Sequence, residues 1–388
     1  MKIGIEGQRL FRKKKHGMDM VVLELIRNLQ EIDKENEYII FVKPGEDETV
    51  LKESGNFRIE KLSTPLYPLW EQIALPGAAE RAGCQILHCT SNTAPVNTSI
   101  PLVVTLHDII YMENSFRRIL RGSGSNYQKL GNLYRRFVVP RILRKSRKII
   151  TVSNFEKNRI GEFFGMKGDS RLVAVYNGVS EHFAPVSDPG LLKQVKEKYN
   201  LPDRFFFFFG NTDPKKNTKG TLQAYSAYLK KIGSNIRLVI PDFDRGELRK
   251  ILGETGDQNL EEMILLPGYI ANTDLPAIYS QCEVFLYPSL RESFGIPMLE
   301  AMACGAPVIS STTSCMPEIA GSAACLADPF FPEAIASAMI HLTEDRDYRA
   351  ALIERGFVRA RDFSWRAMAK EVLAIYKEIG TVKLNRNM

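Results

Sequence analysis

The sequence contains no long apolar run and no paired cysteine motif. No stretch approaches the roughly 18 consecutive apolar residues that a membrane-spanning helix requires, and the opening MKIGIEG lacks the basic-then-apolar pattern of a signal peptide. The six cysteines include no C-x-x-C pair and have no histidine at zinc-ligand spacing. We therefore expect a cytoplasmic protein with reduced, mostly buried cysteines and with no metal or other cofactor.

One segment of the chain lacks acidic residues altogether. From Arg117 to Lys148 it carries eleven Lys and Arg and no Asp or Glu, within a chain of formal net charge +7. Nucleic acid, anionic lipid and phosphorylated substrates all attract clustered cations, although a solvated helix surface would have the same composition. Apolar residues interleave with the cations as on an amphipathic helix, and no nucleic-acid-binding motif accompanies them. Among functional partners we therefore favour an anionic membrane surface, at the inner face of the membrane, and expect no nucleic acid.

Short β-rich runs alternate with helical segments along the whole chain. At 388 residues the chain exceeds what one hydrophobic core supports, and the alternation is typical of parallel sheets flanked by helices. This alternation of strand-like and helical segments is interrupted near residue 180 and then resumes. We therefore predict an α/β fold of two Rossmann-like, doubly wound domains, 1–180 and 181–364, with a C-terminal helix at 365–380 that packs back on the first. Five consecutive phenylalanines, Phe205 to Phe209, predict a strand covered on both faces.

The stretch RESFGIPMLEAMACGAPVIS, Arg291 to Ser310, directly follows the strand-like CEVFLYPSL. Two doubly wound domains would face a cleft, and open α/β sheets bind ligands beyond the carboxyl ends of their strands. Gly295 can adopt a conformation that other residues resist, and Pro297 suits the first turn of a helix. The backbone N–H groups of Phe294, Gly295 and Ile296 would then lie at a helix N-terminus, which favours phosphate.

The same stretch places Glu292 and Glu300 eight residues apart in a strand–turn–helix–strand frame. It closely resembles the E-x7-E signature of the retaining glycosyltransferases of family 4, the group 1 and mannosyltransferase-like enzymes whose two-Rossmann-domain fold is called GT-B. Individually weak motifs resemble the family in the same order along nearly the whole chain. They are VVTLHDIIY, IITVSNFEKNRI, VAVYNGVSEHFAP, FFGNTDPKKNTKGTLQAY, LLPGYIANTDLPAIYSQCEVFLYPS, MPEIAG and FSW.

The resemblance implies roles for three charged residues. Glu292 matches the carboxylate beside the donor sugar, and Glu300 matches the one that accepts hydrogen bonds from the nucleotide ribose. Lys216 matches the lysine that contacts the donor phosphates. The alternative for the glutamates is a pair of helix-terminal charges that favour the helix dipole.

Two further donor-binding positions depart from the family pattern or vary within it. Gly210 matches the glycine that ends the first strand of the second domain, but Asn211 follows it where the family often has arginine. Lys215 stands where many members carry a second cation, and it either replaces that arginine or is a solvated loop charge.

The first domain offers one catalytic candidate and one donor-binding candidate. His107, at the end of the strand-like PLVVTL, matches a histidine near the transferred sugar; the alternatives are a structural histidine or a loop capped by Asp108. Gly17 lies where the first strand-to-helix loop of the family meets its ligands. Four cations, Arg12 to Lys15, precede it, depart from the small residues usual there and would suit an anionic acceptor.

A competing motif is Asp242-Phe243-Asp244, whose D-x-D form binds a metal in the other major glycosyltransferase fold, GT-A. A magnesium site needs carboxylates together with substrate phosphates. Because the family resembled here usually has glycine at this point, we favour a surface loop.

The resemblance implies a transferase that moves a hexose-type sugar from a nucleotide-diphosphate donor to a glycan or lipid-linked saccharide acceptor in surface polysaccharide assembly. A GDP-mannose-like donor is favoured, and a UDP-sugar is compatible. Two alternatives stay open, because fold does not fix chemistry: a nucleotide-sugar epimerase of the same fold, and a non-enzymatic scaffold that binds a nucleotide sugar or lipid. The intact Glu292, Glu300 and Lys216 argue against the scaffold.

Overall fold

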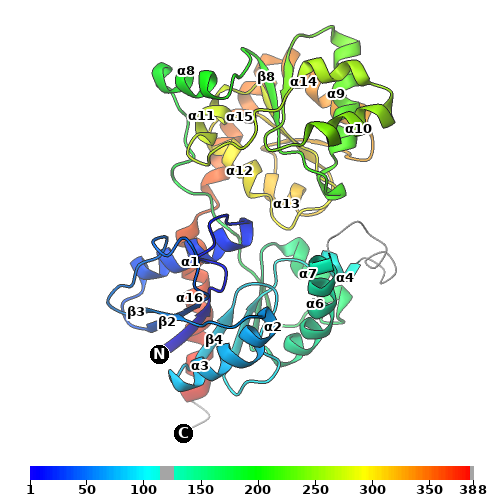
Figure 1. Ribbon diagram of the computed structural model, residues 1–388. Helices are drawn as coiled ribbons and strands as arrows, with labels where there is room; N and C mark the ends of the chain where they lie inside the picture. The colour runs from blue at the N-terminus through cyan, green and yellow to red at the C-terminus, as the bar shows by residue number, and fades with distance from the viewer. Residues whose placement is uncertain (114–125, 385–388) are drawn as a thin grey trace. The chain divides into compact units, whose positions relative to one another are not determined.

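The computed structural model describes residues 1–113 and 126–384, which form two compact α/β units (Figure 1). Unit 1 comprises residues 1–177 together with the segment that begins at Trp365, and unit 2 comprises Gly178–Ser364. The first cations of the predicted basic face, from Arg117 to Arg121, lie outside the described residues.

Unit 1 contains a seven-stranded parallel sheet in the order β3-β2-β1-β4-β5-β6-β7. Its strands are β1 (Lys2–Glu6), β2 (Glu37–Val42), β3 (Phe57–Lys61), β4 (Ile86–Cys89), β5 (Leu102–Thr105), β6 (Lys148–Thr151) and β7 (Leu172–Ala174). Its helices are α1 (Gly17–Ile32), α2 (Tyr67–Leu69), η1 (Trp70–Ala74), α3 (Leu75–Arg81), α4 (Ile110–Glu113), α6 (Asn126–Lys145), α7 (Asn154–Phe163) and α16 (Trp365–Leu384).

Successive side chains of each strand point to opposite faces of the sheet, so the core of unit 1 has one part on each face. Leu87 and Ile149 face the layer that contains η1, α3, α6 and α7. Their neighbours His88 and Ile150 face α1 and α16, which lie side by side in Figure 1. The buried strands of such a sheet read as nearly continuous apolar runs, because both faces are covered.

Unit 2 contains a six-stranded parallel sheet in the order β10-β9-β8-β11-β12-β13. Its strands are β8 (Phe205–Phe208), β9 (Arg237–Val239), β10 (Ile264–Leu265), β11 (Val284–Tyr287), β12 (Val308–Ser311) and β13 (Cys325–Ala327). Its helices are α8 (Pro189–Lys198), η2 (Pro214–Lys216), α9 (Thr218–Ile232), α10 (Arg245–Thr255), η3 (Gln258–Met263), α11 (Leu275–Gln281), α12 (Ile296–Ala303), α13 (Met316–Ala320), α14 (Pro332–Glu344) and α15 (Arg346–Arg361).

The phenylalanine run forms strand β8 at the centre of unit 2, and both of its faces are covered, as predicted. Phe206 and Phe208 pack into the core shared with α9, α10 and α14. Phe207 and Phe209 pack on the opposite face against Tyr279 of α11. The two faces of one strand therefore join the two helical layers of unit 2.

The structure differs from the sequence predictions in two strands of unit 1 and at the end of the last helix. Strands β3 and β7 were not predicted, because β3 reads FRIEK, with three charged residues, and β7 has only three residues. The last helix, predicted for 365–380, continues to Leu384. Gly380 does not end it, because this glycine is a packing residue: a Cβ there would lie 2.1 Å from the sulfur of Met1.

Helix α16 is attached to unit 1 by buried and exposed polar contacts. The imidazole of His88, fully buried on β4, lies between the hydroxyl of Tyr376, 2.6 Å from Nδ1, and that of Thr105, 2.8 Å from Nε2. Lys148 forms an ion pair of 2.8 Å with Glu378. Burial lowers the pKa of His88 to about 3, so this histidine is neutral at physiological pH. His88 therefore joins α16 to the sheet through its two hydrogen bonds.

We expect Tyr376→Phe to loosen α16, because it leaves one buried nitrogen of His88 without a partner at a cost of about 1 to 3 kcal/mol. Amide hydrogen exchange in α16 should become about tenfold to a hundredfold faster. Tyr228→Phe in unit 2 is the control, because its hydroxyl donates to Ser234 at 3.1 Å in a partly buried site far from α16 in sequence. Unchanged exchange in α16 of the Tyr376 variant would contradict this account.

Candidate active site

The candidate site of unit 2 lies where the strand order reverses between β8 and β11. These strands are neighbours in the sheet, and the loops that follow them, 209–217 and 288–295, are joined by hydrogen bonds. The amide of Leu290 donates to the carbonyl oxygen of Lys215 at 2.7 Å. The side-chain amide of Asn217 donates to the carbonyl oxygens of Pro288, at 3.1 Å, and Pro329, at 2.7 Å. Three strand ends are thereby tied to one asparagine.

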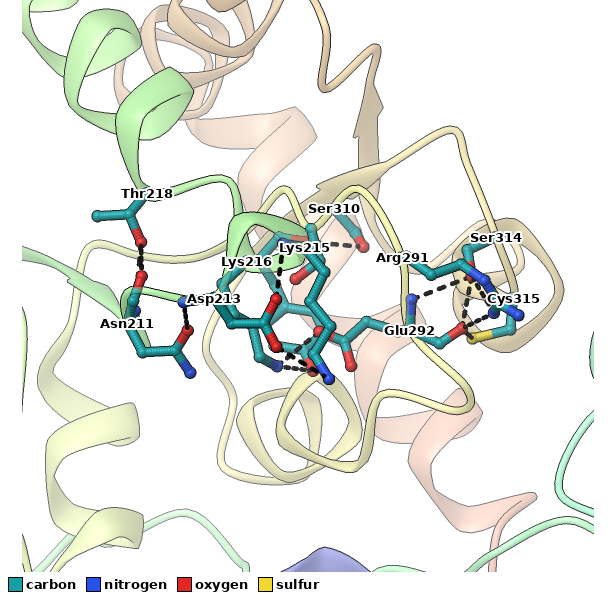
Figure 2. A network of polar contacts seen from close by, with 12 residues as sticks. Asn211, Asp213, Lys215, Lys216, Thr218, Arg291, Glu292, Ser310, Ser314 and Cys315 are labelled. Carbon is teal, nitrogen blue, oxygen red and sulfur yellow. Dashed lines mark hydrogen bonds and ion pairs between the residues drawn. The ribbon is translucent and has the colours of Figure 1, made fainter. Parts of the chain in front are cut away.

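The loop after β8 is held in shape by its own polar side chains (Figure 2). Asn211 accepts from the amide of Asp213 at 2.9 Å, and Asp213 in turn accepts from the amide of Lys215 at 3.1 Å. Thr218 donates to the carbonyl oxygen of Asn211 at 2.7 Å. Only glycine fits at 210, because a Cβ there would lie 2.6 Å from the ring of Phe208. The loop therefore presents Lys215 and Lys216 on a fixed turn.

Lys216 and Glu292 form an ion pair at the centre of this site (Figure 2). The Nζ of Lys216 donates to Oε1 of Glu292 at 2.6 Å, and both side chains are less than one fifth exposed. Nζ also lies 3.4 Å from the hydroxyl of Tyr287 and 5.1 Å from the centre of its ring. Burial raises the pKa of Tyr287, and the charge of Glu292 raises it further, so the tyrosine remains neutral, and its oxygen can accept from Nζ. Lys215 contacts Asp213 at 3.4 Å instead.

The backbone of Glu292 is fixed by the loop after β12. Ser314, whose φ is +61°, has its hydroxyl 3.1 Å from the amide of Glu292 and also donates to the Glu292 carbonyl oxygen. The Cys315 thiol and the Arg291 guanidinium reach the same carbonyl, at 3.3 and 2.9 Å. The backbone of Glu292 is thus held by three neighbouring side chains.

Helix α12 begins as the sequence predicts. Gly295 precedes it with a φ of +95°, the left-handed region that favours glycine, and Pro297 is its second residue. A Cβ at 295 would also approach the Met316 side chain to 3.3 Å. Phe294 is buried against Phe363, at 5.6 Å between ring centres, and Ile296 is the first helical residue. The N-terminus of α12 therefore comes shortly after Glu292 in the chain, and its backbone N–H groups favour an anion.

Glu300 lies on α12, separate from the ion pair, in a poorly solvated environment. Burial raises the pKa of its carboxyl to about 8, and the nearby Tyr279 hydroxyl offsets part of that rise. The side chain is nonetheless partly exposed, so a ligand can reach it. A carboxyl that is neutral at pH 7 and accessible is ready to ionise when hydrogen-bond donors arrive.

In unit 1, His107 follows β5 and is held by the loop after β4. Its amide donates to the side-chain oxygen of Asn92 at 2.6 Å, and its Nε2 lies 2.9 Å from the carbonyl oxygen of Thr90. Because a carbonyl can only accept, Nε2 carries the proton and Nδ1 is the basic nitrogen. Burial lowers the pKa of His107. The neighbouring Asp108 caps the next turn by accepting from the amide of Ile110 at 3.1 Å.

Gly17 is the first residue of α1, preceded by an exposed basic loop. A Cβ at Gly17 would meet nothing within 4 Å, so the packing of unit 1 does not require glycine there. Among the preceding cations, Lys15 pairs with Asp47 at 2.5 Å, whereas Arg12, Lys13 and Lys14 are exposed.

Both aspartates of the D-x-D motif in unit 2 take part in local hydrogen bonds. Asp244 caps α10 by accepting from the amide of Glu247 at 2.9 Å, and the amide of Asp242 donates to the carbonyl oxygen of Gly268 at 2.8 Å. Within residues 1–113 and 126–384, no group of three or more His, Cys, Asp or Glu side chains is arranged to hold a metal ion.

Tyr287, Asn217 and Ser314 contribute to the site and were not predicted. Tyr287 ends a strand at the point where the sheet order reverses, which is a signal that the sequence carries. Asn217 has a φ of +57°, which asparagine tolerates better than most residues. Ser314 comes from a loop 22 residues after Glu292, and no local pattern links the two.

Two family models match the chain one after the other. The model described as Glycosyltransferase Family 4 matches residues 16–183, and the one described as Glycosyl transferases group 1 matches residues 192–359. Among curated proteins, O-antigen chain mannosyltransferase B of Escherichia coli is 32% identical over 237 residues, 61% of this chain and 61% of that protein. O-antigen chain mannosyltransferase RfbU of Salmonella typhimurium is 25% identical over 279 residues, 71% of this chain and 69% of that protein. The chain thus spans less than two thirds of the first of these relatives.

Solved structures share the fold of the chain. Anabaena Alr3699/HepE, whose structure was determined in complex with UDP and glucose, matches with a TM-score of 0.72 over 97% of this chain and 99% of that one, at 16% identity. This likeness is one of fold, and the fold is GT-B, as the sequence predicted. Matched in both of its halves by the two family models, the chain belongs to the family 4 and group 1 glycosyltransferases.

Proposed function

We propose that this protein is a retaining glycosyltransferase that moves a hexose from a nucleotide-diphosphate donor to a glycan or lipid-linked saccharide acceptor in surface polysaccharide assembly. The observation that carries the proposal is the Lys216–Glu292 pair, 2.6 Å long, beside the N-terminus of α12. A cation and a helix N-terminus at the carboxyl edge of one sheet both provide positive charge that can bind a diphosphate.

In this proposal Lys216 and Glu292 are paired with each other only until the donor binds. When the diphosphate binds, Lys216 turns from Glu292 to the phosphate oxygens, and the freed carboxylate of Glu292 faces the sugar ring. Lys216 and the N-terminus of α12 then stabilise the negative charge that develops on the leaving diphosphate. The acceptor hydroxyl attacks the anomeric carbon from the same face as the bond to the diphosphate breaks, and its proton passes to the departing phosphate oxygen. Glu300 accepts hydrogen bonds from the ribose, and Lys215 supplies a second cation once it leaves Asp213.

Mannose is the donor sugar that we favour, with GDP as its nucleotide. Both curated relatives described above are called O-antigen chain mannosyltransferases, whereas the Anabaena structure holds UDP and glucose, so a UDP-sugar is the alternative donor. His107 is proposed to contact the transferred sugar through its basic Nδ1, and Gly17 to let the donor approach the start of α1.

We further propose that unit 1 docks on the anionic inner face of a membrane. No helix within the described ranges is long and apolar enough to cross a bilayer. Two neighbouring segments of unit 1 instead expose apolar side chains, each 41 to 67% exposed. On one segment, at i, i+3 and i+7 spacing, they are Leu66, Leu69 and Ile73; on α6, at the same spacing, they are Leu130, Leu133 and Phe137.

Contacts between Tyr67 and Tyr134 bring these two segments together, with the rings at 6.0 Å and nearly perpendicular. The exposed stripe of α6 continues into cations: Arg141 stacks on Phe137 at 3.6 Å, and Arg144 follows at the next turn. Apolar side chains that continue into arginines complement an anionic lipid surface. Within α6, Arg136 is different, because it donates to the carbonyl oxygens of Tyr111 and Met112 and so is a structural residue.

Glu300→Ala should weaken GDP binding by about tenfold to a hundredfold, because the charged acceptor for the ribose is lost. Since burial keeps Glu300 neutral below a pKa of about 8, its ionisation on GDP binding releases a proton. Wild-type affinity should therefore rise with pH up to about 8, by at most about tenfold per pH unit, and this rise should be absent in the variant. Calorimetry with GDP measures both effects. Glu261→Ala, on the surface of unit 2, is the control; parallel pH profiles for the Glu300 variant and wild type would exclude the ribose role.

Glu292→Gln should act on rate rather than on nucleotide affinity. If the carboxylate faces the sugar as charge develops there, kcat should fall at least about a hundredfold, while GDP affinity should not fall, because Lys216 no longer has to leave a charged partner. Steady-state kinetics with GDP-mannose, alongside the same calorimetry, separates the two glutamates. Donor turnover without any acceptor, giving an isomerised nucleotide sugar, would instead identify an epimerase. Wild-type rates in the Glu292 variant would show that the pair is structural.

Vesicle flotation tests the docking surface. The protein should bind phosphatidylglycerol vesicles and not phosphatidylcholine vesicles, with recovery falling as salt rises. Reversing the charge of Arg141 and Arg144 should weaken binding by roughly tenfold or more, at about 1 kcal/mol per cation near the surface. Ile73→Glu with Phe137→Glu should do the same, whereas Val358→Glu, at an exposed position of unit 2, should not. Equal recovery on neutral and anionic vesicles would refute the surface.

A further inference from the structure

Glu71 is a buried carboxylate that the proposed chemistry does not use. It lies in η1, a π-helical turn between α2 and α3, and its side chain is fully buried. Isolated π-helical turns are rare and frequently occur at functional sites. No ion pair within the described part of the chain includes Glu71. A buried acid without a cation must be stabilised by hydrogen bonds, and its neighbours supply them.

Four neutral groups donate to the Glu71 carboxylate. Oε1 accepts from the hydroxyls of Tyr67, at 2.6 Å, and Thr93. Oε2 accepts from the side-chain amide of Gln72, at 2.8 Å, and from the hydroxyl of Tyr134. Burial raises the pKa of Glu71, and the hydrogen bonds from Thr93, Tyr134 and Tyr67 oppose that rise. The donors come from the π-turn region, from α6 and from the loop after β4, so one side chain joins three segments.

The loop after β4, residues 90–96, is held at both ends as well. Gln72 donates to the carbonyl oxygen of Ala94 at 3.0 Å and accepts from the amide of Val96 at 2.8 Å. At the start of the loop, the carboxylate of Glu6, at the end of β1, accepts from the amide and hydroxyl of Thr90 at 3.2 and 2.9 Å. Two buried carboxylates, Glu6 and Glu71, therefore fix the loop at Thr90 and at Thr93.

This loop supplies both hydrogen bonds that orient His107. Thr90 offers the carbonyl oxygen that fixes the proton on Nε2, and Asn92 accepts from the His107 amide. Asn92 itself has a φ of +70°, in the left-handed region, so the loop adopts a conformation that its surroundings must maintain. Thr93, the next residue, is the one that Glu71 holds.

We propose that Glu71 is a positioning residue, which through Thr93 and the 90–96 loop sets the orientation and the tautomer of His107. The inference rests on the role of His107 in the proposed function, but it concerns a residue that does not touch substrate. A rigid second layer of this kind matters because small displacements of a group that contacts the reacting sugar lower the rate strongly.

Two hydroxyl deletions form a matched pair that tests the proposal. Thr93→Val removes a donor to Glu71 and a contact to Tyr67 at 2.9 Å. Tyr134→Phe removes a donor to the same carboxylate and a contact to Gln72 at 2.8 Å. Both should destabilise unit 1 to a similar extent, but only the first lies on the loop that holds His107. We expect Thr93→Val to lower kcat for GDP-mannose turnover by about tenfold or more, with the KM for donor little changed. Tyr134→Phe should change kcat less than about twofold, and Thr93→Ser should restore it.

A spectroscopic readout tests the same inference without relying on activity. Nitrogen-15 NMR of the histidine side chains, with His107 assigned through His107→Gln, reports which ring nitrogen carries the proton. Wild type and Tyr134→Phe should show the Nε2–H form alone, and Thr93→Val a mixture of forms. Equal losses of kcat in the Thr93 and Tyr134 variants, or an unaltered tautomer in Thr93→Val, would overturn the proposal. Normal turnover in His107→Gln would instead refute the role of His107 in the proposed function, and the tautomer measurement would still decide the positioning.

Discussion

Parallel strands bring all their carboxyl ends to one edge of a sheet, and in each unit of this protein the strand order reverses once at the first strand. In unit 2 the loops that follow β8 and β11 leave the sheet side by side at this reversal, where hydrogen bonds join them. Lys216 comes from one of these loops and Glu292 from the other. The ion pair, the tyrosine beneath it and the adjoining helix N-terminus all depend on this reversal.

The same reversal organises unit 1, but with different chemistry. There, β1 and β4 are the neighbouring strands, and Glu6 at the end of the first binds Thr90 just after the second. Instead of a cation paired with a carboxylate, unit 1 places buried carboxylates among neutral donors. Such a network is costly if any partner is missing, because an unpaired buried acid is strongly destabilised. It therefore holds a loop in one conformation.

Local sequence patterns were sufficient for the features that depend on neighbouring residues. The position of α12, with Gly295 before it and Pro297 in its first turn, follows from conformational preferences that each residue carries alone. The both-faces burial of the phenylalanine strand follows from composition. Long-range partners could not be predicted in this way: Ser314 holds the backbone of Glu292 from another loop, and Glu71 reads locally as one polar residue in an amphipathic helix. The end predicted for the last helix, at residue 380, was wrong for a related reason, since the small size of Gly380 serves a contact with Met1 at the far end of the chain.

The assignment of α16 to unit 1 has a consequence for the order in which the chain can fold. The chain leaves unit 1 after Asn177 and returns to it at Trp365, and the two ends of unit 2 are adjacent, because the Val179 amide donates to the carbonyl oxygen of Phe363 at 3.1 Å. On the ribosome, all of unit 2 is therefore synthesised before the helix that completes unit 1. Until then one face of the first sheet lacks α16, and His88 lacks its tyrosine partner. The domain made first is the last to be finished, and the nascent chain must keep that apolar face from aggregation while the second domain is built.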